Sequence, residues 1–221
     1  MYLSNKRFSI NTGFTTTAEH VERAAIACNN KLRALPHTLY TTIDFKTTSA
    51  IIGCLFCEEL ASEVGAITNP IEKGHPDIVP TSAKSSSEER LRKYPQGIEI
   101  KTTIGNIKLG ANLRAGEQRV EHLTGITWQA HHREVEALMG LAWDFVQEKA
   151  TYIFPGIAGV FYSNELTKED WGEISGTSGR NTKVCGMKAS GKKKMGTGCI
   201  LLLKEEIYIR KYNRLLGTSL T

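Results

Sequence analysis

"GHPDIVP" at residues 74–80 and "GIEIKTT" at residues 97–103 decide how this chain is interpreted. In the first stretch an acid, Asp77, follows a proline and precedes two β-branched residues, which is typical of the start of a strand. In the second stretch Glu99 and Lys101 lie two positions apart, so a strand would place both side chains on one face. We therefore expect two neighbouring strands, joined by a long connection, on which two carboxylates and one ammonium group converge.

Such a cluster suits metal-assisted hydrolysis of a phosphodiester. Mg²⁺ prefers oxygen ligands and is usually held by one or two carboxylates together with waters and substrate phosphate. Asp77 and Glu99 are the expected ligands, with the backbone carbonyl of Ile100 as a third. Lys101 is expected to orient, or help deprotonate, the attacking water beside the phosphate.

The alternative interpretation of the same residues is structural. Glu99 and Lys101 would then form a salt bridge on an exposed strand, and Asp77 would be an ordinary turn acid. An acid-x-Lys triplet arises readily by chance, and Asp44-Phe45-Lys46 is a second example in this chain. The strand context and the upstream carboxylate distinguish the triplet at 99–101.

The order of periodic segments predicts an α/β (α+β) fold, in which helices flank a mixed central β-sheet. Helical spacing of apolar residues predicts helices at 17–35 and 47–65, and 164–174 is expected to be a short polar helix. A polar connection at 81–96 is expected to be an exposed loop. The expected strands cover residues 66–69, 77–80, 97–104, 123–129, 136–146, 156–162 and 199–210.

Length and composition fit one domain, 1–221, comprising an N-terminal helical part (1–44), a catalytic core (45–162) and a basic region with a C-terminal strand (163–221). No stretch approaches the roughly 18 apolar residues that cross a bilayer, and the first residues lack a signal-like apolar run. A cytoplasmic protein without membrane contact is expected. The five cysteines lack the spacing of a zinc site and are expected to be buried, reduced thiols.

The net charge of +5 is unevenly placed, because residues 174–203 carry +6 and no acid, which leaves −1 for the remainder. Glycine and serine surround these charges, a pattern typical of loops that approach a polyanion. Nucleic acid is the expected partner, although a solvated face is the plainer alternative. The candidate contacts in this region are Arg180, Lys183, Lys188, Lys192, Lys193 and Lys194.

Four further residues are candidates for DNA contact. Arg114 and Arg119 lie in "NLRAGEQR", and Gln129 and His131 lie in "WQAHH". Arginine and glutamine read guanine and adenine edges through paired hydrogen bonds, and histidine can hold a phosphate. The alternative for "WQAHH" is that Trp128 belongs to the core and that His131 and His132 end a strand. The other aromatic side chains are expected in the core, namely Trp143, Phe145, Phe161, Tyr162 and Trp171.

Pro76-Asp77 followed by Glu99-Ile100-Lys101 resembles the PD-(D/E)xK nuclease signature, and the chain is similar to type II restriction endonucleases over about residues 45–200. The resemblance implies a restriction-endonuclease-like core and Mg²⁺-dependent, site-specific cleavage of double-stranded DNA that leaves 5′-phosphate and 3′-hydroxyl ends. Mn²⁺ is expected to substitute, and Ca²⁺ to support binding only. Many members add a helix-borne glutamate, for which Glu59 is chosen here over Glu63.

The resemblance also sets expectations about partners. A palindromic target would require a homodimer, since both strands must be cut. A DNA methyltransferase is expected in the same restriction-modification system, acting on the DNA rather than by contact. Two other functions remain open: a non-catalytic nucleic-acid-binding protein, and a repair or junction-resolving nuclease of the same fold.

Overall fold

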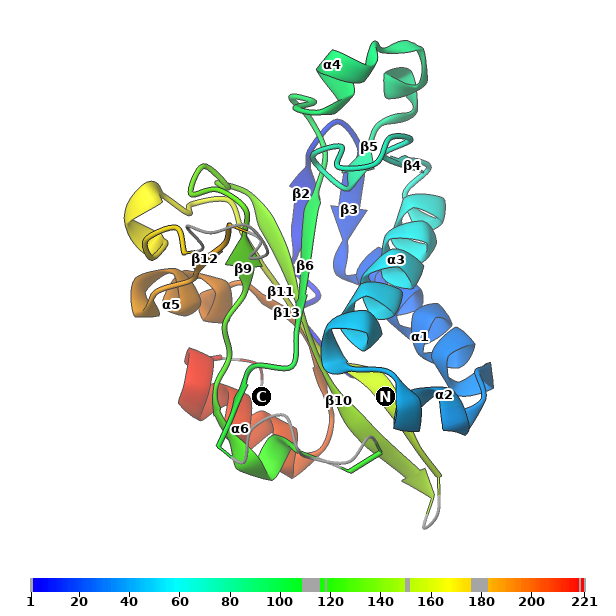
Figure 1. Ribbon diagram of the computed structural model, residues 1–221, viewed down its shortest axis with the longest axis vertical. Coiled ribbons are helices and arrows are strands. Elements are labelled where there is room, and N and C mark those ends of the chain that lie inside the picture. The colour runs from blue at the N-terminus through cyan, green and yellow to red at the C-terminus, as the bar shows by residue number, and fades with distance from the viewer. Residues whose placement is uncertain are drawn as a thin grey trace.

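The computed structural model describes residues 2–108, 116–117, 119–149, 152–175, 183–218 and 220 of the chain. A five-stranded mixed sheet forms its centre, in the order β1-β13-β11-β10-β6 (Figure 1). β6 is parallel to β10, and the other neighbours are antiparallel. The strands are β1 (Tyr2–Ser4), β6 (Glu99–Thr103), β10 (Leu138–Lys149), β11 (Tyr152–Ser163) and β13 (Cys199–Leu203).

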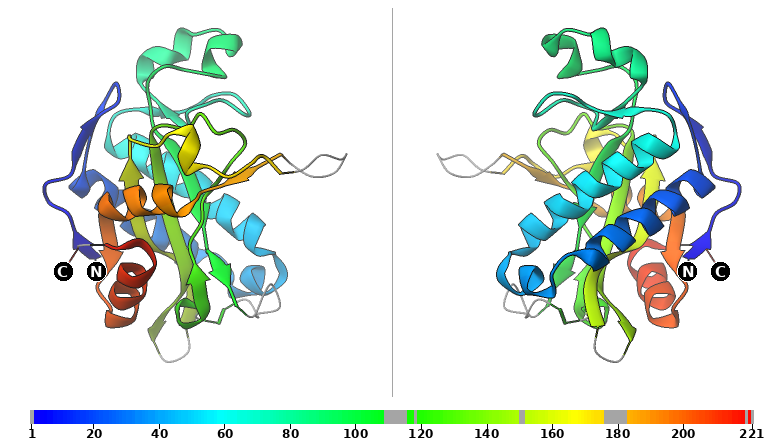
Figure 2. Two further views of the ribbon diagram at one scale, coloured as in Figure 1. Left: turned by 90° about the vertical axis from the view of Figure 1, so that its left-hand side faces the viewer. Right: turned by 90° about the vertical axis from the view of Figure 1, so that its right-hand side faces the viewer.

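Helices cover both faces of this sheet (Figure 2). On one face lie α1 (Ala18–Ala34), α2 (His37–Thr42) and α3 (Phe45–Glu63), and on the other lie α5 (Ala189–Thr197) and α6 (Glu206–Leu216). α1 begins at a capping box made by Thr17 and His20, and Asp44 caps α3 by accepting the backbone N–H of Thr47 at 2.7 Å. The mixed α/β architecture with a flanked central sheet is thus confirmed.

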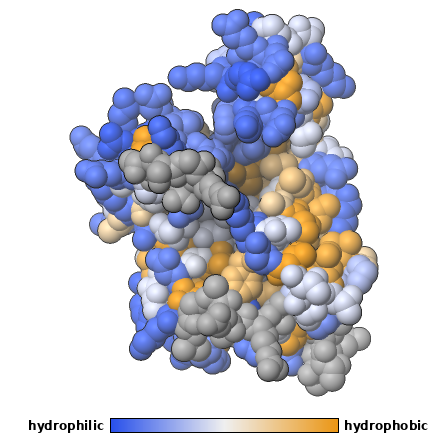
Figure 3. Space-filling view, viewed as in Figure 1, coloured by the Kyte–Doolittle hydropathy of each residue, from blue (hydrophilic) through white to orange (hydrophobic). Residues whose placement is uncertain are grey.

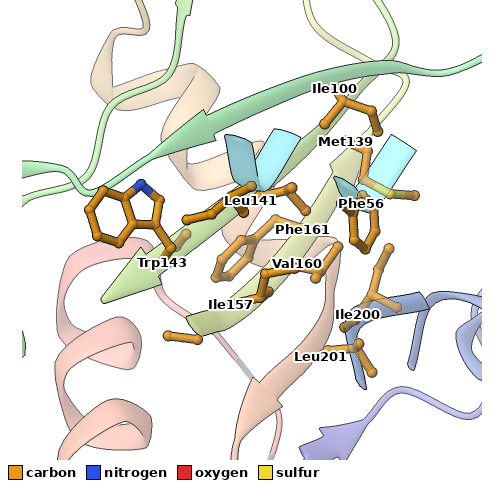
Figure 4. Packing of buried hydrophobic residues seen from close by; sticks show 14 of the residues in the cluster. Phe56, Ile100, Met139, Leu141, Trp143, Ile157, Val160, Phe161, Ile200 and Leu201 are labelled. Atoms are coloured by element: carbon orange, nitrogen blue, oxygen red, sulfur yellow. The ribbon is translucent and has the colours of Figure 1, made fainter. Parts of the chain in front are cut away.

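The core lies between the long β10–β11 hairpin and the helices. Alternate β10 residues would face water in a one-sided sheet, but here Leu138, Met139 and Leu141 are all fully buried. Figure 4 shows Met139, Leu141 and Trp143 of β10 beside Val160 and Phe161 of β11. The five aromatic residues expected in the core are all buried, and so is Trp128, which the sequence left open.

Four two-stranded sheets and several short helices complete the described chain. The sheets pair β2 (Ser9–Asn11) with β3 (Thr15–Thr17), β4 (Ile67–Thr68) with β5 (Ile78–Val79), β7 (Asn106–Ile107) with β8 (Leu123–Gly125), and β9 (Gln129–Ala130) with β12 (Cys185–Gly186). The short helices are η1 (Thr81–Ser85), α4 (Glu88–Leu91), η3 (Val120–His122) and η4 (Lys168–Asp170).

Three local predictions are wrong. The strand expected at 199–210 ends at Leu203 and is followed by α6, because Tyr208, Tyr212 and Leu216 recur every four residues and are buried on one helix face. The helix expected at 164–174 is only the 3-10 turn η4. The connection expected at 81–96 is mostly exposed, as predicted, but its expected loop conformation is wrong, because it contains η1 and α4. We call residues 81–94 the α4 segment. A small apolar cluster of Val79, Ala83, Leu91 and Tyr94 holds it.

Four of the five cysteines are buried, whereas Cys54 is exposed, and all five are free thiols. Within the described part of the chain, no helix is both long and apolar enough to cross a membrane.

A buried carboxylate ties the turn at 119–120 to the sheet. Asp144 of β10 accepts the backbone N–H groups of Arg119 and Val120, at 3.1 and 2.9 Å, and the hydroxyl of Tyr208 at 3.2 Å. Burial raises the pKa of Asp144 to about 6, although these hydrogen bonds act in the opposite direction. The folded protein therefore binds this proton more tightly than the unfolded chain.

The stability of the protein should accordingly depend on pH through Asp144. Its favourable contribution is complete below the ordinary pKa of 3.8 and is lost as pH rises through about 6. Between pH 4 and 7 the free energy of unfolding of the wild type, relative to Asp144→Asn, should fall by up to about 3 kcal/mol, at about 1.4 kcal/mol per unit of pKa difference. Urea denaturation of both proteins across this range measures the difference, and a constant difference would contradict the assignment.

Candidate functional site

The site begins where β5 meets the start of β6. Ile78 and Ile98 exchange backbone hydrogen bonds, with N–H to O distances of 3.1 and 2.9 Å. Gly97 makes this approach possible, because it has a φ of +136° and a Cβ atom there would lie 2.1 Å from the carbonyl oxygen of Ile78. The residues on either side of this pairing, Asp77 and Glu99, are thereby brought to neighbouring positions.

Asp77, Glu99 and Lys101 form one cluster. The carboxylate of Asp77 accepts the backbone N–H of Ile100 at 2.7 Å, and Lys101 forms an ion pair with Glu99. The side chain of Ile100 belongs to the core, so Glu99 and Lys101 point to the opposite face of β6, as period-2 geometry predicts. Glu99 is only 7% exposed, which excludes the simple exposed salt bridge of the structural alternative.

His75 is a member of this cluster that sequence reasoning missed. Its Nδ1 lies 3.2 and 3.1 Å from the two carboxylate oxygens of Glu99. The residue stands within the "GHPDIVP" stretch, two positions before Asp77, but no spacing rule links position 75 to position 99. The Ile78–Ile98 pairing brings the two side chains together.

The charges within the cluster shift one another's pKa values. Burial, and next the negative charge of Glu99, raise the pKa of Asp77 to about 6. Burial also opposes ionisation of Glu99, but the hydrogen bond from His75 and the charge of Lys101 outweigh it and lower the pKa of Glu99. The pKa of Lys101 is raised, because attraction to Glu99 and Asp77 exceeds the effect of burial. Glu99 is thus held ionised, while Asp77 retains its proton more readily.

The cluster opens into a cleft of about 1110 Å³ between α3, the β4–β5 sheet and β6. Figure 3 shows the molecule hollowed below the α4 segment. Asp77, Ile100 and Lys101 line this cleft together with His75 and His131. The volume and the mixed polar lining suit a ligand larger than a metal ion alone.

The helix-borne acid chosen from the sequence does not join the cluster. The carboxylate of Glu59 lies 2.5 Å from the Nζ atom of Lys31, so it faces α1. Glu58, one residue earlier, lines the cleft with Cys54 and Cys57. Glu63 instead pairs with Arg23 at 2.7 Å. The rotation of α3 about its axis decides which of these acids faces the cleft, and the sequence leaves that rotation uncertain by one residue.

The β9–β12 pair carries two of the other candidates, of which one reaches the cleft. His131, which follows β9, lines it, and Gln129 of β9 is exposed. The ring of His132 meets that of His75 edge to face, with their centroids 6.1 Å apart. These side chains approach the acid cluster from a strand pair far from it in sequence.

Of the three arginines expected to contact DNA, the structure describes only Arg119. Arg119 is fully buried, with its guanidinium 4.1 Å from the ring centroid of Phe45 and 4.7 Å from that of Phe145. Its expected role as a DNA contact is corrected to one in the core. Arg114 and Arg180 lie outside the described residues.

The basic residues around α5 lie on a helix rather than on the loops expected there. Lys192, Lys193 and Lys194 belong to α5, Lys188 precedes it, and Lys183 is exposed ahead of β12. The ammonium group of Lys194 lies 2.7 Å from both the carboxylate of Asp170 and the carbonyl oxygen of Glu165, so it anchors α5 to η4. Successive residues on a helix point about 100° apart, which separates the three lysines.

The donor set can be compared with what a metal ion requires. Among the described residues, no group of three or more His, Cys, Asp or Glu side chains is arranged to hold a metal ion. Two neighbouring carboxylates and the backbone carbonyl of Ile100 nonetheless match the oxygen ligands of Mg²⁺, which usually retains several waters. After burial, repulsion from Glu99 is the main cause that raises the pKa of Asp77, and a bound cation would relieve this repulsion.

No family model matches this chain, and neither a curated protein nor a solved structure matches it. The chemistry of this chain therefore has to follow from the geometry of the cleft and from the residues that line it.

Gly97 provides a test of this geometry that is independent of function. Gly97→Ala should cost about 1 to 3 kcal/mol for backbone strain, and more because its Cβ would collide with the backbone of Ile78. Gly65→Ala is the matched control, since Gly65 also has a positive φ of +65° but has open space around it. Denaturant unfolding gives the two costs, and amide exchange reports on the pairing. Equal costs, with unchanged protection of the Ile98 amide, would contradict the close approach.

Proposed function

We propose that this protein is a Mg²⁺-dependent, site-specific endonuclease of double-stranded DNA. One observation carries the proposal: a buried carboxylate, Glu99, and a half-buried one, Asp77, lie beside Lys101, and Asp77 and Lys101 line a wide cleft. Charged groups at such a position cost folding free energy, and perturbed pKa values of this kind are concentrated at functional sites. The products would be 5′-phosphate and 3′-hydroxyl ends.

In this proposal each residue of the cluster has a separate task. Asp77 and Glu99, with the carbonyl of Ile100, would hold the cation. When bound, Mg²⁺ supplies positive charge that polarises the phosphodiester and stabilises the leaving 3′ oxygen. Lys101 would orient the attacking water against the phosphate from the same face of β6 as Glu99. Mn²⁺ would replace Mg²⁺ in turnover, whereas Ca²⁺ would support only binding.

The architecture supports a restriction-endonuclease-like core as part of the proposal. The Glu99–Lys101 strand, β6, is at the edge of a mixed sheet whose two faces are covered by helices, and the Asp77 strand pairs with the residue just before β6. Active-site residues at a sheet edge remain open to a polymeric substrate, which a fully enclosed site would not admit. A homodimer follows if the target is palindromic, and a DNA methyltransferase would protect the same sites.

Basic side chains near α5 and in the cleft support DNA as the substrate. Lys183, Lys188, Lys192 and Lys193 are available from the α5 side, and Lys73 lines the cleft. Gln129 and His131 are suited to contact a base edge or a phosphate near the acid cluster.

A non-catalytic nucleic-acid-binding protein is the second candidate, and one observation favours it. Glu99 already accepts interactions from both His75 and Lys101, which is the pairing expected of a purely structural buried charge. Binding of DNA without any cleavage by the wild type would be its signature.

Variants of the cluster separate the two candidates. Asp77→Asn, Glu99→Gln and Lys101→Ala should each reduce Mg²⁺-dependent cleavage by at least about 100-fold, because each removes a group that acts in the reaction. Binding of DNA in Ca²⁺ should fall much less for Lys101→Ala than cleavage does. Cleavage rates of a defined plasmid and gel-shift affinities measure the two effects.

Two controls match these variants in chemistry. Glu59→Gln removes a carboxylate that pairs with Lys31, and Lys46→Ala removes the lysine of the chance acid-x-Lys triplet. Both should cut at close to the wild-type rate. Cleavage that survives in all three cluster variants, or that is lost equally in the controls, would refute the proposed site.

The lysines of α5 allow the electrostatic part of the proposal to be tested. Joint replacement of Lys192 and Lys193 by alanine should weaken binding to the cleaved sequence and to random DNA by similar factors. It should also flatten the dependence of log affinity on log salt by up to about 0.9 for each phosphate that the variant no longer neutralises. Lys194→Ala should mainly lower thermal stability, because Lys194 is bonded to Asp170. An unchanged salt slope, with weaker binding confined to the cleaved sequence, would exclude phosphate contacts at these positions.

A further inference from the structure

The histidine of the "GHPDIVP" stretch contacts the carboxylate that the proposed function assigns to the metal. The Nδ1 atom of His75 faces both oxygens of Glu99, at 3.2 and 3.1 Å. An N–H at Nδ1 therefore makes a bifurcated hydrogen bond to the carboxylate. Lys101 contacts the same carboxylate through a single oxygen.

The backbone of His75 is held firmly by the α4 segment. Its N–H donates to the carbonyl oxygen of Leu91 at 3.1 Å, and its carbonyl oxygen accepts the N–H of Tyr94 at 2.7 Å. The side-chain amide of Asn69 bonds to the carbonyl oxygens of Pro76 and Leu91, at 3.1 and 2.9 Å. These contacts fix the point on the backbone from which the imidazole extends toward β6.

The two partners of Glu99, His75 and Lys101, differ in how strongly they can restrict the orientation of its carboxylate. An ammonium group on a flexible four-carbon stem can follow a carboxylate as it rotates, whereas an imidazole, a rigid ring on two side-chain torsions, can follow it less. A carboxylate offers about four lone-pair positions, so His75 and Lys101 leave some of them available to a cation. The imidazole thus restricts the rotation of the carboxylate without using all of its binding capacity.

We propose that His75 is a positioning residue, whose Nδ1–H orients the Glu99 carboxylate for binding the divalent cation. The inference rests on the proposed function, since it assumes that Glu99 is a metal ligand. Ligating carboxylates are generally oriented by outer hydrogen-bond partners, and removal of such a partner typically costs 10- to 100-fold in metal affinity. The α4 segment acquires a role through this contact, because it holds the backbone of the orienting residue.

Replacement by the two amides gives a sharp test. The amide nitrogen of asparagine reaches approximately the position of Nδ1, whereas that of glutamine lies farther out, so His75→Asn retains the donor and His75→Gln displaces it. Both side chains are neutral and polar, and that of His75 is 31% exposed, so both variants should fold. Thermal denaturation checks that they do.

Calorimetric titration of Ca²⁺ into each protein bound to DNA measures metal affinity without turnover. His75→Ala and His75→Gln should weaken Ca²⁺ binding by 10- to 100-fold, while His75→Asn should recover most of the loss. In Mg²⁺, the concentration for half-maximal cleavage should rise by a similar factor in the weakened variants, and the rate at saturating Mg²⁺ should change much less. His132→Ala is the matched control and should leave Ca²⁺ affinity unchanged, because its ring meets His75 but is not bonded to Glu99 in the structure.

The outcomes separate this inference from the proposed function. If Asp77→Asn and Glu99→Gln abolish Ca²⁺ binding but His75→Ala does not weaken it, His75 has no positioning role and the proposed function stands. Equal losses in His75→Asn and His75→Gln would also overturn the inference, because the donor position would then be irrelevant. If Asp77→Asn and Glu99→Gln leave Ca²⁺ affinity unchanged, the proposed metal site itself fails.

Discussion

The backbone pairing of Ile78 with Ile98 is the constraint on which the candidate site depends. It requires Gly97, whose positive φ and missing Cβ allow two main chains to approach at a point where any other residue would collide. The pairing carries Asp77 to the amide of Ile100 and His75 to the carboxylate of Glu99. It also connects the α4 segment to the edge of the main sheet, so that a small satellite core and the large core meet at the cluster.

The electrostatics of the cluster follow from this enforced proximity. Two carboxylates that would titrate near their ordinary pKa values in water are held together, Glu99 buried and Asp77 half-buried, and the pKa of Asp77 is raised to about 6 as a result. His75 and Lys101 compensate Glu99 more directly than Asp77. In the proposed function, the negative charge that His75 and Lys101 do not neutralise attracts a divalent cation. The free energy lost by holding the two carboxylates together in the folded protein is then recovered when the cation binds.

The sequence could predict this site where the chemistry follows local periodicity. The common face of Glu99 and Lys101 follows from the period of a strand, and "GHPDIVP" and "GIEIKTT" indicated neighbouring strands because both are β-rich and lie on either side of a polar connection. Helices at 18–34 and 45–63 were predicted from their apolar spacing, to within about two residues. These predictions needed no information about distant contacts.

The remaining features depend on tertiary contacts that no local pattern contains. His75 meets Glu99 through the Ile78–Ile98 pairing. Arg119 is buried against Phe45 and Phe145, which are distant from it in sequence. Glu58 and Glu59 point about 100° apart on α3, and the packing of α3 against α1 decides which of them faces the cleft. The polar connection at 81–96 folds because Leu91 and Tyr94 pack against Val79. So few apolar residues, at irregular spacing, give no recognisable pattern in the sequence.

The most direct measurement is to sequence the ends of DNA after incubation of a defined plasmid with the protein in Mg²⁺. The account predicts 5′-phosphate ends at a short recurring sequence, produced by the wild type and absent with Asp77→Asn. Plasmid that is bound but remains uncut in Mg²⁺ and in Mn²⁺ would contradict the account, and would identify the acid cluster as a structural feature of a nucleic-acid-binding protein.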